Sequence, residues 1–370
     1  MSPVRSARFV FRAGGAVTEV LVGGGAFRAL GTRLPRIAPG RWFAVSSRPV
    51  FRRHGEALLR GAAGADLDPR PLWVPDGEAA KTWPVLGRLL SELAARGLKR
   101  DGGIVALGGG TVGDVAGLAA ALALRGVPVV QAPTTLLAAA DSALGGKTAV
   151  DLPSGKNLAG AFHMPRLVVV EPDVLSTLSL RAYRSGLAEV VKSALLSRSF
   201  FRAMPRLLPG LLARDRASVA EAVRRALAMK AAVVAADPFE RRGRRFALNL
   251  GHTAGHALES ASGYRLTHGE AVAWGLLVAL RLSVARAGLS SGVFSTAEGW
   301  IAELVRPPRP SVSALGTWSA RLPADKKSDR AGLVAVLLAA PGRVAIARVS
   351  TKELAAALEA SLPSYNRFET

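Results

Sequence analysis

Short apolar runs alternate with longer stretches of helical periodicity over roughly the first 180 residues. Seven runs rich in β-branched residues predict strands, namely "ARFVF", "EVLVG", "WFAVS", "PLWV", "GIVALG", "VPVVQAP" and "RLVVVEP". Helices are predicted between them at 51–63, 84–97, 113–124 and 135–143. Such alternation is typical of an α/β domain whose mainly parallel sheet is covered by helices on both faces.

The pattern changes near residue 182, where long helices rich in alanine, leucine and arginine begin. They are predicted at 183–198, 216–236, 269–287 and 351–361. The proline-rich "RPPRP" at 306–310 predicts a loop among them. We therefore predict an α/β domain over residues 1–181, followed by an all-α domain over residues 182–370.

Composition narrows the class of protein. Of the 370 residues, 49% are apolar, which is typical of a folded globular chain. No apolar run reaches the roughly 18 residues that a membrane span needs. No apolar core follows Arg5, Arg8 and Arg12, as it would in a signal peptide. The absence of cysteine excludes disulfides and thiolate metal ligands. We expect a cytoplasmic protein without a membrane partner.

The formal net charge of +22 favours an anionic ligand. Nucleic acid is one candidate, but the arginines are spread along the chain and no basic run is interleaved with aromatic residues. No helix-turn-helix or zinc-finger spacing occurs either. The densest cluster, "ERRGRR" at 240–245, is typical of a solvated loop. We therefore expect small phosphorylated substrates, and no nucleic acid.

Lysine is scarce in this chain. Only nine of the 49 basic residues are lysine, so we expect those to stand where a compact ammonium group is needed. Seven of them lie in glycine-rich or acid-rich stretches: Lys81, Lys147, Lys156, Lys192, Lys230, Lys326 and Lys327.

The stretch "GIVALGGGTVGD" at 103–114 predicts a strand, a glycine-rich turn and the start of a helix. Its glycines satisfy G-x-G-x-x-G, in which backbone amides at a helix N-terminus approach a pyrophosphate. The acid that binds ribose in an ordinary Rossmann unit is missing, because the next strand runs into Gln131 and Pro133. The pattern favours a dinucleotide site, and a tight turn without a ligand is the alternative.

Two glycine-flanked lysines follow this stretch. "GGKT" at 145–148 does not complete a phosphate loop, because the first glycine of that motif would fall at Asp141. Lys147 remains, and "SGKN" adds Lys156 and Asn157. These residues are compatible with an anion site, for a phosphate or a carboxylate, and equally with two surface loops.

Three histidines and one glutamate could form a metal site. Glu189 lies in "SGLAEVVKSALL", a helix that is apolar nearly all round, so its carboxylate needs a metal or cation partner. His252 and His256 lie four residues apart in "NLGHTAGHALE", and His268 follows. Glu189, His252 and His268 would form the two-histidine, one-carboxylate set of a catalytic zinc, with His256 as a fourth contact or a proton carrier. A solvated histidine pair is the alternative, and the missing glutamate of H-E-x-x-H disfavours a metalloprotease.

In combination, these stretches resemble the 3-dehydroquinate synthase family of sugar-phosphate cyclases over nearly the whole chain. The matching segments are "PDGEAAK", "GGGTVGDVAG", "PTTLLAAADSALGGKTAV", "SGKNLAGAF", "SGLAEVVKSALL", "LNLGHTAGHALE", "HGEAVAWG" and "DKK", in the order of the family. The resemblance implies an NAD-binding α/β domain, a helical domain that binds metal and substrate, zinc or cobalt as the metal, and a homodimer.

The resemblance also implies roles for single residues. Glu189, His252 and His268 would hold the metal. The residues implied around NAD are Asp76, Gly77, Glu78, Lys81, Gly110, Thr111, Val112, Gly113, Asp114, Thr134, Thr135, Lys147 and Lys156. Those implied around the substrate are Asp141, Lys147, Asn157, Lys192, Lys230, Arg245, Asn249, His256 and one of Lys326 and Lys327. Arg125 would reach a phosphate across the dimer interface.

The implied reaction is that of a carbon–oxygen lyase in the shikimate pathway of aromatic amino-acid synthesis. The substrate, 3-deoxy-D-arabino-heptulosonate 7-phosphate, would be oxidised transiently by NAD, lose phosphate, be reduced again, and close into 3-dehydroquinate by an aldol step. His256 would move substrate protons, while Lys192 and Lys230 would orient hydroxyl groups.

Two other enzyme classes stay open. A sister cyclase, such as a valiolone or 2-deoxy-scyllo-inosose synthase, acts on a sugar phosphate without a carboxylate. Arg245 favours a substrate that carries a carboxylate, because a guanidinium group binds that anion well. Less favoured is a metal-dependent polyol dehydrogenase, which would release reduced cofactor.

Overall fold

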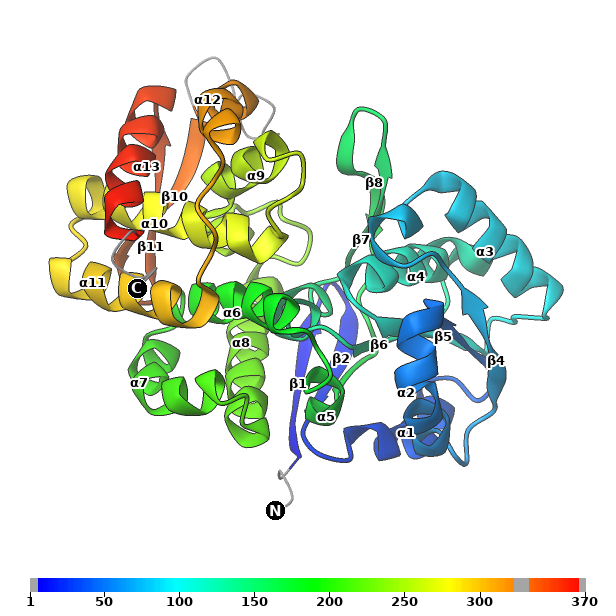
Figure 1. The fold of residues 1–370 in the computed structure, drawn as a ribbon. Coiled ribbons are helices and arrows are strands. Elements are labelled where there is room, and N and C mark those ends of the chain that lie inside the picture. The colour runs from blue at the N-terminus through cyan, green and yellow to red at the C-terminus, as the bar shows by residue number, and fades with distance from the viewer. Residues whose placement is uncertain (1–5, 323–332, 366–370) are drawn as a thin grey trace. The chain divides into compact units, whose positions relative to one another are not determined.

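The computed structural model describes residues 6–322 and 333–365. Lys326 and Lys327 therefore lie outside the described residues. The chain forms two compact units (Figure 1). The first comprises Met1–Leu178 and Val219–Arg241, and the second comprises Ser179–Ser218 and Arg242–Thr370. The first unit thus includes a later piece of chain that carries Lys230.

The first unit is built on a seven-stranded sheet with the order β1-β2-β9-β6-β5-β3-β4. Its strands are β1 (Ala7–Ala13), β2 (Ala16–Val22), β3 (Trp42–Ser46), β4 (Leu67–Trp73), β5 (Gly103–Gly108), β6 (Val129–Pro133) and β9 (Leu167–Val170). All pairings are parallel except that of β1 with β2. These are the seven strands predicted from the sequence, so the prediction of a mainly parallel sheet is confirmed.

Helices cover both faces of this sheet. Successive residues of β3 point to opposite faces: Trp42 packs with α1 (Leu30–Ile37) and α2 (Arg48–Gly61), whereas Phe43 packs with α3 (Trp83–Ala95) and α4 (Gly110–Leu122). Strands β3, β5, β6 and β9 are buried along their whole length. This explains their unbroken apolar sequences, which are typical of a parallel sheet buried on both sides.

The direction in which successive strands are added to the sheet reverses between β3 and β5. Strand β3 pairs with β4 on one side and with β5 on the other, and β5 then pairs with β6. The loops that follow β3 and β5 therefore leave the same edge of the sheet in opposite directions. Such a switch point forms the crevice in which open α/β sheets bind ligands.

A hairpin follows β6, in a region whose sequence is equally compatible with two surface loops. Strand β7 (Lys147–Leu152) pairs antiparallel with β8 (Gly155–Phe162). The helix predicted at 135–143 is present, but its last part, Ala138–Ser142, is a π-helix. Helix α8 (Arg216–Ala236) covers the predicted range 216–236.

The second unit is rich in helices, as predicted. It contains α6 (Leu180–Leu195), α7 (Arg198–Leu212), α9 (His252–Ala261), α10 (His268–Ala287), α11 (Ser291–Trp300), α12 (Val312–Arg321) and α13 (Thr351–Tyr365). It also contains an antiparallel hairpin, β10 (Leu333–Ala340) with β11 (Arg343–Val349), which the all-α prediction did not include.

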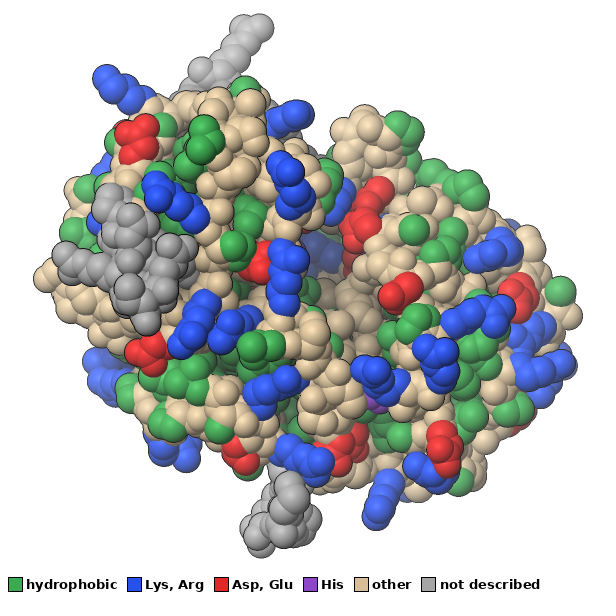
Figure 2. All heavy atoms as spheres, viewed as in Figure 1, with side chains coloured by type: hydrophobic (Ala, Val, Ile, Leu, Met, Phe, Trp, Pro, Cys, Tyr) green, Lys and Arg blue, Asp and Glu red, His purple; other side chains and the backbone are tan. Residues whose placement is uncertain are grey.

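Two surface properties bear on possible partners. Over the described ranges, no helix combines the length and the apolar character that crossing a membrane requires. Figure 2 shows one face of the molecule, where lysine and arginine side chains are scattered among acidic and apolar ones.

Candidate active site

Two glycines of α10 allow three helices of the second unit to approach closely. A Cβ atom on Gly269 would lie 1.8 Å from the carbonyl oxygen of Ser185 in α6. A Cβ atom on Gly275 would lie 1.8 Å from the carbonyl oxygen of Gly251, the residue before α9. No side chain fits at these contacts, so glycine is required. Helix α10 is thereby held against α6 and against the start of α9.

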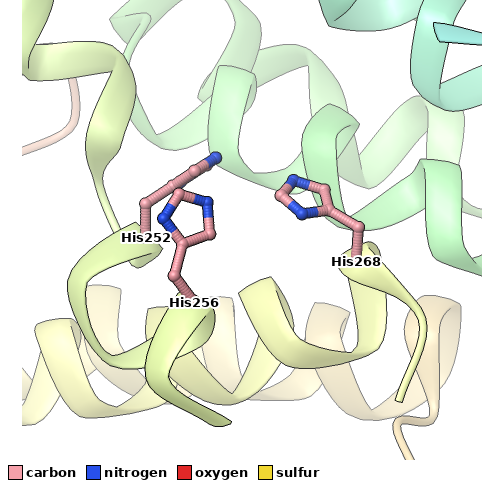
Figure 3. A group of neighbouring side chains, drawn as sticks. All are labelled: His252, His256 and His268. Atoms are coloured by element: carbon pink, nitrogen blue, oxygen red, sulfur yellow. The ribbon is translucent and has the colours of Figure 1, made fainter. Parts of the chain in front are cut away.

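This packing brings Glu189 of α6 together with His252 of α9 and His268 of α10. The Nε2 atoms of His252 and His268 lie 3.7 Å and 3.5 Å from Oε1 of Glu189. His256, one turn beyond His252, completes a cluster in which one ring nitrogen of each histidine lies within 4.8 Å of the others. Figure 3 shows the three imidazoles directed toward a common space.

The spacing of these atoms fits a metal ion. Ligands at about 2.1 Å from a tetrahedral zinc ion lie roughly 3.4 Å from one another, which is close to the two distances measured to Glu189. The carboxylate of Glu189 is buried, with one oxygen 2.5 Å from the Lys192 ammonium and the other facing the two histidine Nε2 atoms. A divalent cation would satisfy this carboxylate, so the donor set fits zinc or cobalt.

The electrostatics of the cluster prepare Glu189 and His252 for a cation, whereas the pKa of His268 is raised to about 9, because contacts with Glu189 and Glu259 outweigh its burial. Burial opposes the charge of Glu189, but Lys192 and the two neighbouring histidines outweigh it and hold the pKa of Glu189 well below its ordinary value. Burial and the Lys192 charge lower the pKa of His252, which keeps this imidazole neutral. An ionised carboxylate and a neutral imidazole are the forms that bind a metal.

Two contacts orient the histidine rings. The Nδ1 atom of His268 lies 3.2 Å from a carboxylate oxygen of Glu259, and Nδ1 of His252 lies 3.2 Å from the carbonyl oxygen of Leu250. In each ring the Nε2 atom is the one that faces Glu189. Carboxylate and carbonyl partners of this kind fix the ring orientation of metal-binding histidines. Glu259 was not predicted from the sequence.

The glycine-rich stretch of the first unit forms the turn between β5 and α4, as predicted. Helix α4 begins at Gly110 after Gly109, no side chain caps its N-terminus, and its first turn carries no acidic residue. The N–H groups of Gly110, Thr111 and Val112 are among the donors that a helix start leaves without intrahelical partners. They lie at the switch point of the sheet and fit a dinucleotide pyrophosphate.

Other residues predicted around NAD lie at the ends of the neighbouring strands. Asp76, Gly77 and Glu78 follow β4, and Thr134 and Thr135 follow β6. Asp76 accepts a hydrogen bond of 2.8 Å from the hydroxyl of Ser47, which comes directly after β3. The structure therefore brings the ends of β3 and β4 together at the edge where α4 begins.

Lys81 connects two groups of predicted residues. Its ammonium donates a hydrogen bond of 2.8 Å to Asp114 of α4 and another to the side-chain oxygen of Asn157 in β8. Burial raises the pKa of Asp114, and the Lys81 charge opposes that rise. Nearby, Lys156 pairs with Glu78 at 3.4 Å. The β7–β8 hairpin thus places its anion-binding candidates beside the residues predicted to bind NAD.

Two further lysines of the first unit pair with acids. Lys230 of α8 lies 2.8 Å from the Asp141 carboxylate and donates to the Asp141 carbonyl oxygen at 2.7 Å. Lys147, at the start of β7, lies 2.6 Å from a carboxylate oxygen of Glu240. Glu240 belongs to the segment "ERRGRR", which the sequence analysis interpreted as a solvated loop. No sequence signal had indicated this pair.

Three further residues predicted to bind the substrate lie next to the helices described above. Arg245 and Asn249 belong to the 3-10 helix Arg244–Asn249, directly before α9, and Arg245 is buried. Arg125 follows α4 and has a left-handed backbone conformation, with φ of 68°.

Comparisons with known proteins find similar sequences and similar folds. The family model for the 3-dehydroquinate synthase N-terminal domain matches residues 71–185, and the C-terminal model matches residues 186–328. A 3-dehydroquinate synthase of Paracoccus denitrificans is 47% identical over 277 residues, which cover 74% of this chain and 75% of that protein. One from Xanthomonas oryzae pv. oryzae is 47% identical over 271 residues, covering 70% and 73%.

Solved structures with the same fold include two sugar-phosphate cyclases. A 2-deoxy-scyllo-inosose synthase complexed with carbaglucose-6-phosphate, NAD+ and Co2+ matches with a TM-score of 0.84 and 24% identity, covering 96% of this chain and 100% of that one. The 2-epi-5-epi-valiolone synthase of Streptomyces hygroscopicus, with NAD+ and Zn2+ bound, matches with a TM-score of 0.78 and 26% identity, covering 88% and 91%.

Proposed function

We propose that this chain, which belongs to the 3-dehydroquinate synthase family, converts 3-deoxy-D-arabino-heptulosonate 7-phosphate into 3-dehydroquinate and phosphate. It is an NAD- and metal-dependent lyase of aromatic amino-acid synthesis. The observation that carries the proposal is the convergence of Glu189, His252 and His268 at the spacing of ligands to one metal ion. NAD binding by residues 1–181, and metal and substrate binding by residues 182–370, are parts of the same proposal.

The roles of single residues follow from their surroundings. When bound, NAD supplies a transient hydride acceptor and the divalent metal supplies Lewis acidity. Glu189, His252 and His268 would hold the metal, and the N-terminus of α4 would hold the cofactor pyrophosphate. Lys192 carries its ammonium beside Glu189, where it can orient a substrate hydroxyl. His256 is exposed, unlike the buried residues on either side of it, and is our candidate for moving substrate protons at its imidazole nitrogen.

Charged side chains would orient the two anionic ends of the substrate. The β7–β8 hairpin carries Lys147 and Asn157, which would bind an oxyanion of the substrate. Arg245 is the candidate for the substrate carboxylate, which distinguishes this substrate from those of the sister cyclases. Holding both ends removes much of the orientational freedom that opposes an intramolecular reaction.

The test is phosphate release by the purified protein with NAD and zinc. 3-Deoxy-D-arabino-heptulosonate 7-phosphate is one substrate, and sedoheptulose 7-phosphate is assayed in parallel. Release from the first substrate without accumulation of reduced cofactor is the expected result. Release only from the second would make the chain a sister cyclase, and accumulation of reduced cofactor would indicate a polyol dehydrogenase.

We further propose that the protein acts in the cytoplasm as a homodimer in which Arg125 serves the partner subunit's substrate phosphate. Light scattering after gel filtration measures whether the protein is a dimer. To test the role of Arg125 across the interface, we would mix Arg125→Gln with Glu189→Gln, two variants expected to be inactive. Random exchange of subunits should restore roughly a quarter of the active sites. A dimer without restored activity would mean that Arg125 does not act across the interface.

A further inference from the structure

Three polar side chains of α6 lie on the helix face that meets the start of α10. Arg181, Ser185 and Glu189 are spaced four residues apart, and residues with this spacing share one face of a helix. In the same order, they contact three consecutive residues of α10: Glu270, Gly269 and His268. The two candidate metal ligands, Glu189 and His268, are therefore the last pair in a row of three contacts.

Arg181 makes the most extensive of these contacts. Its Nε and Nη2 atoms each donate a hydrogen bond of 2.8 Å to one oxygen of the Glu270 carboxylate. Nη2 also donates one of 2.7 Å to the carbonyl oxygen of Arg265, ahead of the helix. Arg181 thus holds the chain on both sides of His268. A guanidinium group that binds a carboxylate through two parallel bonds fixes the geometry as well as adding energy.

Glu270 also contacts the residue before α10. Its carboxylate accepts a hydrogen bond of 2.7 Å from the Thr267 amide, and the Thr267 hydroxyl accepts one of 3.3 Å from the Glu270 amide. These reciprocal bonds form a capping box, which starts a helix without help from another element. Arg181 is therefore not needed to begin α10. What it determines is where the start of α10 lies relative to α6.

Ser185 fixes the separation of the two helices at the middle contact. Its buried hydroxyl accepts a hydrogen bond of 3.1 Å from the Gly269 amide. Its carbonyl oxygen lies so near Gly269 that a Cβ atom there would be 1.8 Å away. A wider separation would break the hydrogen bond, and a narrower one would cause a clash between the backbones. The helices are therefore held at one distance beside His268.

Stability alone does not explain the Arg181–Glu270 pair. The Arg181 side chain is 58% exposed, so water competes for it, whereas that of Glu270 is 7% exposed and has lost most of its hydration. The pair lies at the end of α10 that carries His268. Metal ligands need supporting contacts that hold them within about 0.5 Å of the required geometry. The position of the pair fits this task.

We propose that Arg181 and Ser185 are positioning residues for the metal: they fix the start of α10 against α6, so that Nε2 of His268 faces Glu189 at the spacing of two ligands of one ion. The inference rests on the proposed function, because it assumes that Glu189 and His268 bind a metal. Both residues act through His268. Removing contacts that orient metal ligands typically lowers metal affinity about tenfold to a hundredfold.

The experiment compares Arg181→Lys with the unchanged protein, each prepared without metal. Lysine keeps a charge beside Glu270 but lacks the planar fork that binds both carboxylate oxygens. We expect the dissociation constant of zinc, measured by competition with a chelator, to rise about tenfold. The visible absorption spectrum of the cobalt-loaded protein should also change, because it depends on the arrangement of the ligands. A role in stability alone would change neither quantity.

Two further variants keep the result interpretable. Arg286→Lys makes the same substitution near the other end of α10, where Arg286 pairs with Glu353 of α13 at 2.8 Å, and should leave zinc affinity and the cobalt spectrum unchanged. Ser185→Ala removes the hydrogen bond to Gly269 without changing any charge, and should also weaken zinc binding. It replaces Arg181→Lys if urea denaturation of the metal-free protein shows that the lysine variant is unfolded.

Two results would overturn the inference: unchanged zinc affinity and an unchanged cobalt spectrum in the folded variant, or an equal loss of affinity in Arg286→Lys. The titrations do not depend on turnover. A protein that binds zinc but does not release phosphate from 3-deoxy-D-arabino-heptulosonate 7-phosphate would therefore contradict the proposed function and still measure the role of Arg181.

Discussion

The Nε2 atom of His268 lies 3.5 Å from Oε1 of Glu189, although α6 and α10 are distant in the sequence. We expect Glu189→Gln, His252→Ala and His268→Ala each to lose bound zinc, because each removes one of three ligands. The zinc content of the dialysed protein, measured by mass spectrometry, is the test. Normal content in any variant would remove that residue from the ligand set.

Glu259 should affect the metal more weakly, since it contacts His268 at Nδ1 and not at the Nε2 atom that faces Glu189. We expect Glu259→Gln to reduce zinc affinity about tenfold to a hundredfold without abolishing binding. A competition titration with a zinc chelator measures this change. Glu303→Gln, at an exposed position of the second unit, is the matched control and should bind zinc like the unchanged protein.

Gly275 should be essential for the metal site although it binds nothing. Gly275→Ala would force its Cβ into the backbone at Gly251, next to His252, and separate α10 from α9. We expect a loss of about 2 to 4 kcal/mol in the free energy of unfolding, together with weaker zinc binding. Urea denaturation with and without zinc measures both effects.

Gly87→Ala is the control for that substitution. Gly87 lies within α3, and a Cβ there would meet no atom within 4 Å. Alanine favours a helix over glycine, so this variant should be more stable by up to about 1 kcal/mol. If both glycine variants were equally destabilised, the close approach at Gly275 would not be the cause.

Lys81 should matter for the cofactor and not for the metal. Lys81→Gln removes the ammonium that hydrogen-bonds Asp114 and Asn157 and leaves the half-buried Asp114 with less compensation for its charge. We expect the dissociation constant of NAD to rise at least about tenfold, as followed by tryptophan fluorescence, with unchanged zinc content. Lys99→Gln, at a lysine outside the predicted site, is the control.

The fold was predictable where a sequence pattern is typical of only one kind of secondary structure. Strands such as β5 and β9 are unbroken apolar runs because helices bury both of their faces. The β7–β8 hairpin was missed because β8 is largely exposed and contains glycine and lysine, which are depleted in strands. Strand β10, "LVAVLLAA", was missed because its alanines and leucines are equally typical of a helix.

The residues of the candidate site likewise differ in whether a local sequence pattern reveals them. Glu189 could be recognised because an acid on an apolar helix needs a partner, and His252 because a second histidine stands on the same face. The ion pair between Glu240 and Lys147 could not be recognised, because the two residues are far apart in the sequence. The close approach at Gly275 was hidden for the same reason: a glycine within a helix does not reveal which backbone it touches.

The last prediction concerns acid stability and Asp68 of β4. Its carboxylate has no exposed surface and lies 2.9 Å from the Arg96 guanidinium and 3.7 Å from that of Arg41. Burial acts to raise the pKa of Asp68, but hydrogen bonds from the Arg70 amide and from Arg96 outweigh it and hold the pKa below its ordinary value. The folded state therefore binds this proton less readily than the unfolded state does.

A lowered carboxyl pKa contributes stability above the unfolded-state pKa of about 4, and this contribution is lost as the pH falls through the folded-state value. We expect Asp68→Asn to lower the free energy of unfolding by about 2 kcal/mol or more at pH 7. Urea denaturation should show a constant difference from pH 8 to pH 5, which then shrinks below about pH 4. A difference that disappeared near pH 6 would point to a histidine, and one that persisted undiminished in acid would mean that Asp68 contributes through packing, without its charge.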